Sequence, residues 1–397
     1  MIEKHRLVLC LALILGSGGH ARAADPRIRA ISADDSSGTA SAVVVDGSLA
    51  LVHTSQILPL DAQQKQVVAE NTVRQSEVVL DRLEARLTEA RSGLDRLIKL
   101  NVYARDSQAV ADFRPSLAKR LAGTARPAVS FVTGALTDPD ARVAVDAIAG
   151  TALKTEPGVV LRPGPGLAVL PPGARVYVSG QAEAGEDLRL STRKTLEGLA
   201  ATLKFLGLER SQVVQVKAFL QPMTAVADVE REIADFFDET AAPTRVFVEW
   251  RSGPKQPIEI ELIAASRADD ARPALEFLAP PGLKPSPVFS RIARVNRGDL
   301  IYVSGLYASG GLSGRDQVED LFATLSKVLS ASGSDLRHLA KATYYVSEDD
   351  ASRALNDLRP KYYDPTRPPA ASKAVVPGVG MEGRSITFDM IAVARSS

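Results

Sequence analysis

The sequence predicts an α+β fold made of three consecutive blocks of about 100 residues, each ordered strand-strand-helix-strand-helix-strand. Apolar residues recur at helical spacing in two stretches of every block. The same landmarks also recur: a lysine after the first helix, a proline after the second helix, and an acid in the closing strand. These landmarks are Lys99, Lys217 and Lys341; Pro127, Pro243 and Pro369; and Asp146, Glu261 and Asp389. We therefore expect each block to lay its helices on one face of its sheet.

The blocks are expected at residues 40–150, 160–266 and 286–397. Links rich in proline and glycine separate them at 151–173 and 266–287. At up to roughly 3.3 Å per extended residue, such links are long enough to cross a small domain.

In the first block, residues 42–52 are strand-like, and Asp46-Gly47 within them predicts a hairpin. From 61 to about 97 the apolar residues follow helical spacing, and 97–104 returns to strand. The other blocks carry equivalent helical stripes. These are Leu196, Leu199, Leu203 and Leu206; Val226, Val229 and Ile233; Val318, Leu321 and Leu325; and Leu355, Leu358 and Tyr362.

The first residues form a separate pattern. Lys4 and Arg6 precede a short apolar run, 7–15, and Ala21-Arg22-Ala23 follows a few residues later. This is typical of a secretory signal peptide, and the run is too short to span a bilayer. We predict a signal peptide at 1–23 and a periplasmic or secreted protein without membrane contact after cleavage. The alternative is a disordered or buried N-terminus.

The charge balance and the scarcity of cysteine exclude several classes of function. Without residues 1–23 the chain keeps 45 basic and 46 acidic residues, so it has no basic field for nucleic acid. The one cysteine, Cys10, leaves with the signal peptide, which removes disulfides and thiol chemistry. His53 and His338 lie far apart in sequence and are poor material for a metal site or a Ser-His-Asp triad. No metal and no cofactor are expected.

The central block contains Val176-Tyr177-Val178-Ser179-Gly180-Gln181, Pro243-Thr244-Arg245-Val246-Phe247-Val248-Glu249 and Ile258-Glu259-Ile260-Glu261. With these motifs it resembles the RidA/YjgF family of small trimeric enamine/imine deaminases. The third block resembles the family through Leu300-Ile301-Tyr302-Val303-Ser304-Gly305, and the first block in layout only.

The resemblance implies three tandem RidA-like (chorismate mutase-like) domains that close into a single-chain pseudo-trimer. Family members form rings of three chains, with sheets facing the centre, helices outside and clefts between neighbours. The protein is then expected to be monomeric. Three separate domains without a ring are the alternative, and they would leave apolar sheet faces exposed.

The resemblance also implies site residues. Arg245 matches the arginine that binds a substrate carboxylate, and guanidinium suits that task. Glu259 matches the catalytic acid that positions the attacking water, and Phe247 is expected to form a cleft wall. The remaining candidates for substrate binding are Ser179, Gly180, Ser304, Gly305, Asn356 and Phe289.

The other blocks depart from this pattern. Val129 and Ala371 replace the arginine, and Ala144 and Thr387 replace the acid. At most one complete cleft is therefore expected, which combines Arg245 and Glu259 with groups from a neighbouring block.

Ordinary structural roles are the alternative for several of these side chains. Arg245 would be a surface residue paired with Glu249. Glu261 is expected to be a solvated acid of its strand. The three landmark lysines are expected to extend from strand ends towards water.

Two functions fit these features. The first is hydrolytic deamination of a small imino or enamino carboxylate at one inter-repeat cleft. The second is a non-catalytic module or structural pseudo-trimer that binds a small carboxylate-bearing ligand, which an exported location favours. A ribonuclease activity, attributed to some family members, is disfavoured by the near-zero net charge and by the lack of a histidine pair.

Overall fold

The computed structural model describes residues 25–253, 255–282, 286–310 and 313–395. The predicted signal peptide at 1–23, with Cys10, lies outside these residues. In the described part of the chain, no helix is both long and apolar enough to cross a membrane.

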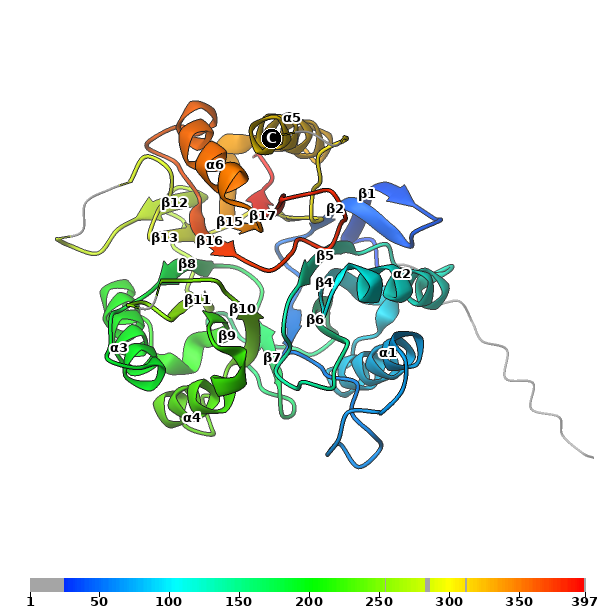
Figure 1. The fold of residues 1–397 in the computed structure, drawn as a ribbon. Coiled ribbons are helices and arrows are strands. Elements are labelled where there is room, and N and C mark those ends of the chain that lie inside the picture. Colours follow the sequence, from blue (N-terminus) through cyan, green and yellow to red (C-terminus); the bar gives the residue numbers. More distant parts are fainter. Residues whose placement is uncertain (1–24, 254, 283–285, 311–312, 396–397) are drawn as a thin grey trace, which may run out of the picture.

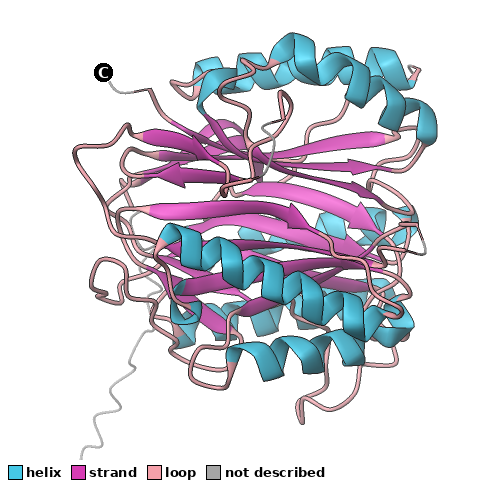
Figure 2. Ribbon diagram, turned by 90° about the vertical axis from the view of Figure 1, so that its left-hand side faces the viewer, coloured by secondary structure: helices cyan, strands magenta, loops and turns pink. Residues whose placement is uncertain are grey.

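Three groups of elements in similar order surround a common centre, with the strands inside and the helices outside (Figure 1). The first group comprises β1 (Ile28–Asp34), β2 (Thr39–Val45), β3 (Leu51–Thr54), α1 (Thr72–Glu89), β4 (Leu97–Ala104), α2 (Ser107–Leu121), β5 (Ala128–Thr133) and β6 (Val143–Gly150). The second comprises β7 (Leu167–Leu170), β8 (Arg175–Gln181), α3 (Leu188–Leu206), β9 (Val213–Leu220), α4 (Val226–Phe237), β10 (Thr244–Glu249) and β11 (Ile258–Ala265). The third comprises β12 (Leu275–Leu278), β13 (Ile292–Val295), β14 (Leu300–Val303), α5 (Gly314–Ala331), β15 (Leu339–Val346), α6 (Asp349–Tyr362), β16 (Ala370–Val375) and β17 (Ile386–Val393). Short 3-10 turns lie at Leu94–Arg96, Arg210–Gln212, Met223–Ala225 and Leu336–His338. In side view the helices cover the outside of the strand layers (Figure 2).

The helices follow the predicted apolar stripes, but their ends depend on local caps. The first helix begins at Thr72 rather than near Asp61, because Asn71 caps it by accepting a hydrogen bond from the backbone of Arg74. The preceding residues form a loop closed by a bridge between Leu60 and Val67. Helix α3 ends at Gly207, whose φ of 68° suits glycine better than any residue with a side chain.

The predicted hairpin at Asp46-Gly47 is wrong. Strands β2 and β3 both exist, but β2 pairs with β14 of the third block, and β3 pairs with β6 and with β7 of the second block. In the same way β13 of the third block pairs with β8 of the second. Each block therefore lends its first core strand to the sheet of a neighbour. A turn motif specifies a reversal of the chain, but it does not specify whether the two strands pair with each other.

The exchanged strands give three sheet sections of similar order. The second section runs β10-β9-β11-β8-β13-β12, and the first runs β5-β4-β6-β3-β7. The third runs β16-β15-β17-β14-β2, with β1 added at its end, and one bridge from β2 to β5 connects it to the first. The arginine-bearing strand β10 thus lies at one edge of its section, while β11 and β8 lie in the middle.

The landmark lysines and acids meet in the interior between blocks. Lys99 Nζ lies 2.9 Å from Asp389 Oδ1, and Lys341 Nζ lies 2.8 Å from Glu261 Oε1. These four side chains are buried. The expectations that the lysines extend to water and that Glu261 is solvated are therefore wrong. Each pair joins two different blocks, so each charge finds its partner only when the blocks close on one another.

Candidate functional site

Each block meets the next through an edge strand and the end of a neighbouring core strand, and we call these three contacts seams. At the first–second seam, the backbone N–H of Arg245 donates to Ser55 Oγ at 3.0 Å. At the second–third seam, the N–H of Gly180 donates to Ser372 Oγ at 3.1 Å. At the third–first seam, the N–H of Gly305 donates to the carbonyl of Val129 at 2.9 Å.

Arg245 and Glu259 lie at different seams, so the expectation of one cleft that holds both is wrong. Arg245 lies on the edge strand β10, which contacts the first block. Glu259 lies on β11 beside Gly180 of β8, which contacts the third block. Each block presents these two positions to different neighbours, so a complete pair needs the arginine of one block and the acid of the next. Here Arg245 faces a block with Ala144 in the acid register, and Glu259 faces a block with Ala371 in the arginine register.

The Glu259 carboxylate packs directly against Gly180. A Cβ atom on Gly180 would lie 1.9 Å from Glu259 Oε1, so any side chain at this position would have to displace the Glu259 carboxylate. Burial raises the pKa of Glu259 to about 7, and the charge of Glu261 adds to the rise. The Ser372 hydroxyl and the charges of Arg291 and Lys373 oppose it. Glu259 therefore exchanges a proton near neutral pH, which is the property needed of a general acid or base.

We expect Gly180→Ala to displace the Glu259 side chain and to lower stability by about 1–3 kcal/mol, because the added methyl group overpacks the seam. Thermal or urea unfolding measures the loss. Gly253→Ala is the matched control, because a Cβ there meets nothing within 4 Å and should leave stability unchanged. Equal stability of the two variants would contradict the close packing at Gly180.

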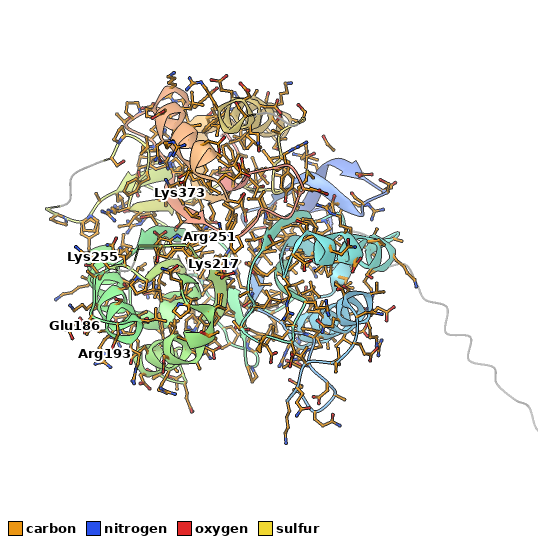
Figure 3. The ribbon with its side chains drawn as sticks, in the orientation of Figure 1. Glu186, Arg193, Lys217, Arg251, Lys255 and Lys373 are labelled. Carbon is orange, nitrogen blue, oxygen red and sulfur yellow. The ribbon has the colours of Figure 1, made fainter. Side chains whose placement is uncertain are left out.

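The charges of two cationic groups from the third block, Lys373 and Arg291, act on this acid, and Arg359 lies beside Lys373. Lys373 Nζ donates to Ser352 Oγ at 3.1 Å and to Asn356 Oδ1 at 3.2 Å. The same Asn356 oxygen accepts from Arg359 Nη2 at 3.0 Å. Burial lowers the pKa of Lys373, the charge of Arg359 lowers it further, and Glu259 opposes both. Figure 3 labels Lys373 where the third block meets the second.

The guanidinium group of Arg291 lies over the aromatic ring of Phe289. Its guanidinium carbon lies 5.2 Å from the centre of the Phe289 ring. Both residues line a hollow of about 300 Å³ between the start of the third block and its 365–368 loop. The Arg291 side chain forms no hydrogen bond or ion pair with the described residues, so its donors are available to a ligand.

The seam with Glu259 thus gathers many of the predicted residues. Ser179 joins them through its backbone N–H, which donates to the carbonyl of Arg291 at 2.9 Å. The predicted members of this group are Ser179, Gly180, Glu259, Phe289 and Asn356.

The other predicted residues lie elsewhere. Arg245 borders a separate hollow of about 240 Å³ next to Phe237 and Pro243. It does not pair with Glu249, whose carboxylate accepts instead from the N–H of Ala135 at 2.6 Å. Phe247 is 4% exposed and packs in the hydrophobic core of the second block, so it does not form the predicted cleft wall.

Ser304 and Gly305 lie at the third–first seam, which is tightly packed. The Ser304 hydroxyl accepts from the N–H of Val129 at 2.8 Å and donates to the carbonyl of Ala40 at 2.6 Å. A Cβ on Gly305 would lie 3.2 Å from the Cα of Ser130. With Val129 and Thr387 in the arginine and acid registers, this seam lacks both functional groups.

Sequence reasoning missed Ser372, Lys373 and Arg291. One indication was present: Lys373 follows Ala371 by two residues, in the register in which Phe247 follows Arg245, and it interrupts an otherwise small and apolar strand. Among the described residues, no group of three or more His, Cys, Asp or Glu side chains is arranged to bind a metal ion.

Comparison with known families agrees with the motifs of the second block. The model of the Endoribonuclease L-PSP family matches residues 35–151 and 168–266, more than half of the chain. The chain belongs to this family. A RutC family protein of Pyrococcus horikoshii is 33% identical over 110 residues, which cover 25% of this chain and 86% of that protein.

Solved structures of single family members are similar to parts of this RidA/YjgF-like chain. The YjgF gene product of E. coli is 28% identical, covers 24% of this chain and 83% of its own, and has a TM-score of 0.23. E. coli TdcF with bound serine is 28% identical, covers 24% and 82%, and has a TM-score of 0.22. Membership in this family supports a deaminase-like or binding role on small molecules.

Proposed function

We propose that this protein is an exported, single-chain counterpart of a RidA trimer, and that it hydrolyses a small imino or enamino carboxylate at the second–third seam. The proposal of three copies rests on the common order of elements in the three blocks and on the regular exchange of strands between them. Export rests on the pattern of residues 1–23, and fractionation of cells that express the full chain tests it.

The observation that carries the reaction is the set of groups around Glu259. Water addition to an iminium carbon needs an oriented water and a group that exchanges a proton near neutral pH. Glu259, whose pKa burial raises to about 7, supplies that group. Arg291 supplies hydrogen-bond donors to the substrate carboxylate. The arginine that binds this carboxylate in the family is replaced at this seam by Ala371.

The test is an imine-hydrolysis assay with an imino acid generated in situ by an amino-acid oxidase, corrected for spontaneous hydrolysis. We expect Arg291→Ala to raise KM about tenfold to a hundredfold, because a charge-assisted pair contributes about 1.5–3 kcal/mol. Arg245→Ala is the matched control, since Arg245 lies at the other seam, and it should leave the rate unchanged. A loss of rate in Arg245→Ala, with Arg291→Ala unaffected, would place the reaction at the first–second seam instead.

The second candidate function is carboxylate binding without catalysis, and the surroundings of Arg245 favour it. Arg245 borders its own hollow, and its seam has Ala144 where a catalytic acid would stand. If this second function is correct, a small carboxylate such as pyruvate should raise the melting temperature of the wild type but not that of Arg245→Ala. If neither protein responds to the ligand, a binding role for Arg245 is ruled out.

A further inference from the structure

Lys373 differs from Lys99 and Lys341, two of the lysines at the contacts between blocks. Lys99 and Lys341 are held by buried carboxylates. Lys373 Nζ is instead held by two neutral acceptors, Ser352 Oγ at 3.1 Å and Asn356 Oδ1 at 3.2 Å. Among the described residues, no carboxylate lies within 4.0 Å of this amine. An ion pair would keep the amine protonated, whereas neutral acceptors also fit its uncharged form.

The surroundings of this amine match those of lysines that act as nucleophiles. Such lysines are partly desolvated and lie near another cation, which favours the neutral amine. Lys373 is half-buried, and Arg359 shares its Asn356 acceptor. Glu259 is close enough for its charge to act on Lys373. The amine of Lys373 and the carboxyl group of Glu259, which exchanges a proton near neutral pH, therefore lie at the same seam.

We propose that Lys373 is a nucleophile of this seam and that its Nζ forms an imine with the C2 carbon of a small 2-imino or 2-oxo acid. This inference rests on the proposed function, because it assigns a covalent route to the same site. Lys373 would then have a catalytic role rather than a structural one.

The step balances as a transimination. The neutral Lys373 amine adds to C2 of the protonated imino acid, and a new C–N bond forms. Glu259 takes a proton from the attacking nitrogen and returns it to the departing nitrogen. The original C–N bond then breaks, ammonia leaves, and a protonated imine to Lys373 remains. Water adds to C2 of this imine, a proton moves from the added water to the Lys373 nitrogen, and the bond to Lys373 breaks to give the 2-oxo acid and the protonated amine. This amine passes its proton to the released ammonia and becomes neutral again.

Reductive trapping tests the proposal, because the product oxo acid forms the same imine in the reverse direction. The full chain is incubated with pyruvate, reduced with borohydride, and analysed by intact mass and peptide mapping. We expect one adduct per chain, on Lys373. Lys373→Arg, which keeps the charge but lacks the nucleophile, should lose the adduct, and the exposed Lys255→Arg should keep it.

Peptide mapping of the wild type keeps the test decisive if a Lys373 variant does not fold. No adduct, or adducts on exposed lysines alone, overturns the proposal. The hydrolysis assay separates this failure from that of the proposed function. If the wild type yields no trapped adduct and Lys373→Arg still hydrolyses the imine, the covalent route is ruled out and the reaction assigned to Glu259 remains. An adduct on Lys373 without hydrolysis leaves a carbonyl-binding lysine and removes the deaminase.

Discussion

Glu259→Gln is expected to lower kcat/KM for imine hydrolysis by about 10²–10⁴-fold, because the amide keeps the shape of the carboxyl but cannot exchange a proton. The wild-type rate should also depend on pH. Since burial raises the pKa of Glu259 to about 7, the ionised form that accepts a proton from water accumulates as pH rises through that value. We therefore expect kcat/KM to increase across this range in the wild type, and the increase to be absent in Glu259→Gln.

Glu249→Gln is the matched control for this substitution. Glu249 is a half-buried acid at the end of β10, and its carboxylate contacts the backbone of the first block rather than the second–third seam. Its loss should leave the pH profile unchanged. If Glu259→Gln kept the wild-type rate and the same increase of kcat/KM with pH, a group other than Glu259 would be the one that accepts the proton.

Lys99→Met is expected to cost about 3–5 kcal/mol of unfolding free energy, because it leaves Asp389 buried without its closest counter-charge. Burial by itself raises the pKa of Asp389, but Lys99 and the neighbouring Lys217 and Lys341 outweigh it, so the pKa lies below its ordinary value. The pair joins the first block to the third, so it connects elements near the two ends of the described chain. Urea unfolding followed by circular dichroism measures the loss.

The double variant Lys99→Met/Asp389→Leu should recover most of this stability, since it removes both charges from the interior. Lys327→Met replaces an exposed lysine and should change stability by less than about 0.5 kcal/mol. If the double variant were as unstable as Lys99→Met, the cost would come from packing at Lys99 rather than from the unpaired acid.

Local patterns in the sequence were sufficient for most of the elements. The predicted strand 97–104 is β4. In the predicted stripe of α3, Leu196, Leu199 and Leu203 are buried and Leu206 is partly buried. Helical and strand periodicities depend on residues a few positions apart, so they are readable without tertiary information. The start of α1 was missed by about ten residues, because a polar loop with occasional apolar residues imitates helical spacing.

The assignment of partners between blocks was not readable in the same way. Asp46-Gly47 correctly indicated a turn, yet the strands on either side pair with different partners in different sections of the sheet. The motifs singled out Arg245 and Glu259 as partners in one cleft, yet the two residues lie at different seams. The sequence did not predict a role for Lys373, because a single lysine in a strand is common and its neighbours from other blocks are not visible in the sequence.

The sequence by itself determined the three-block α+β order, the family and the registers in which arginine and acid are kept or lost. Only the tertiary structure decided which registers face each other, that the lysines and acids pair across blocks, and that Glu259 shares its seam with Lys373 and Arg291. The physical reason is that periodicity and turn chemistry act over a few residues. Contacts between edges of different sheet sections depend instead on how segments far apart in the sequence pack together, and no local pattern of residues encodes that packing.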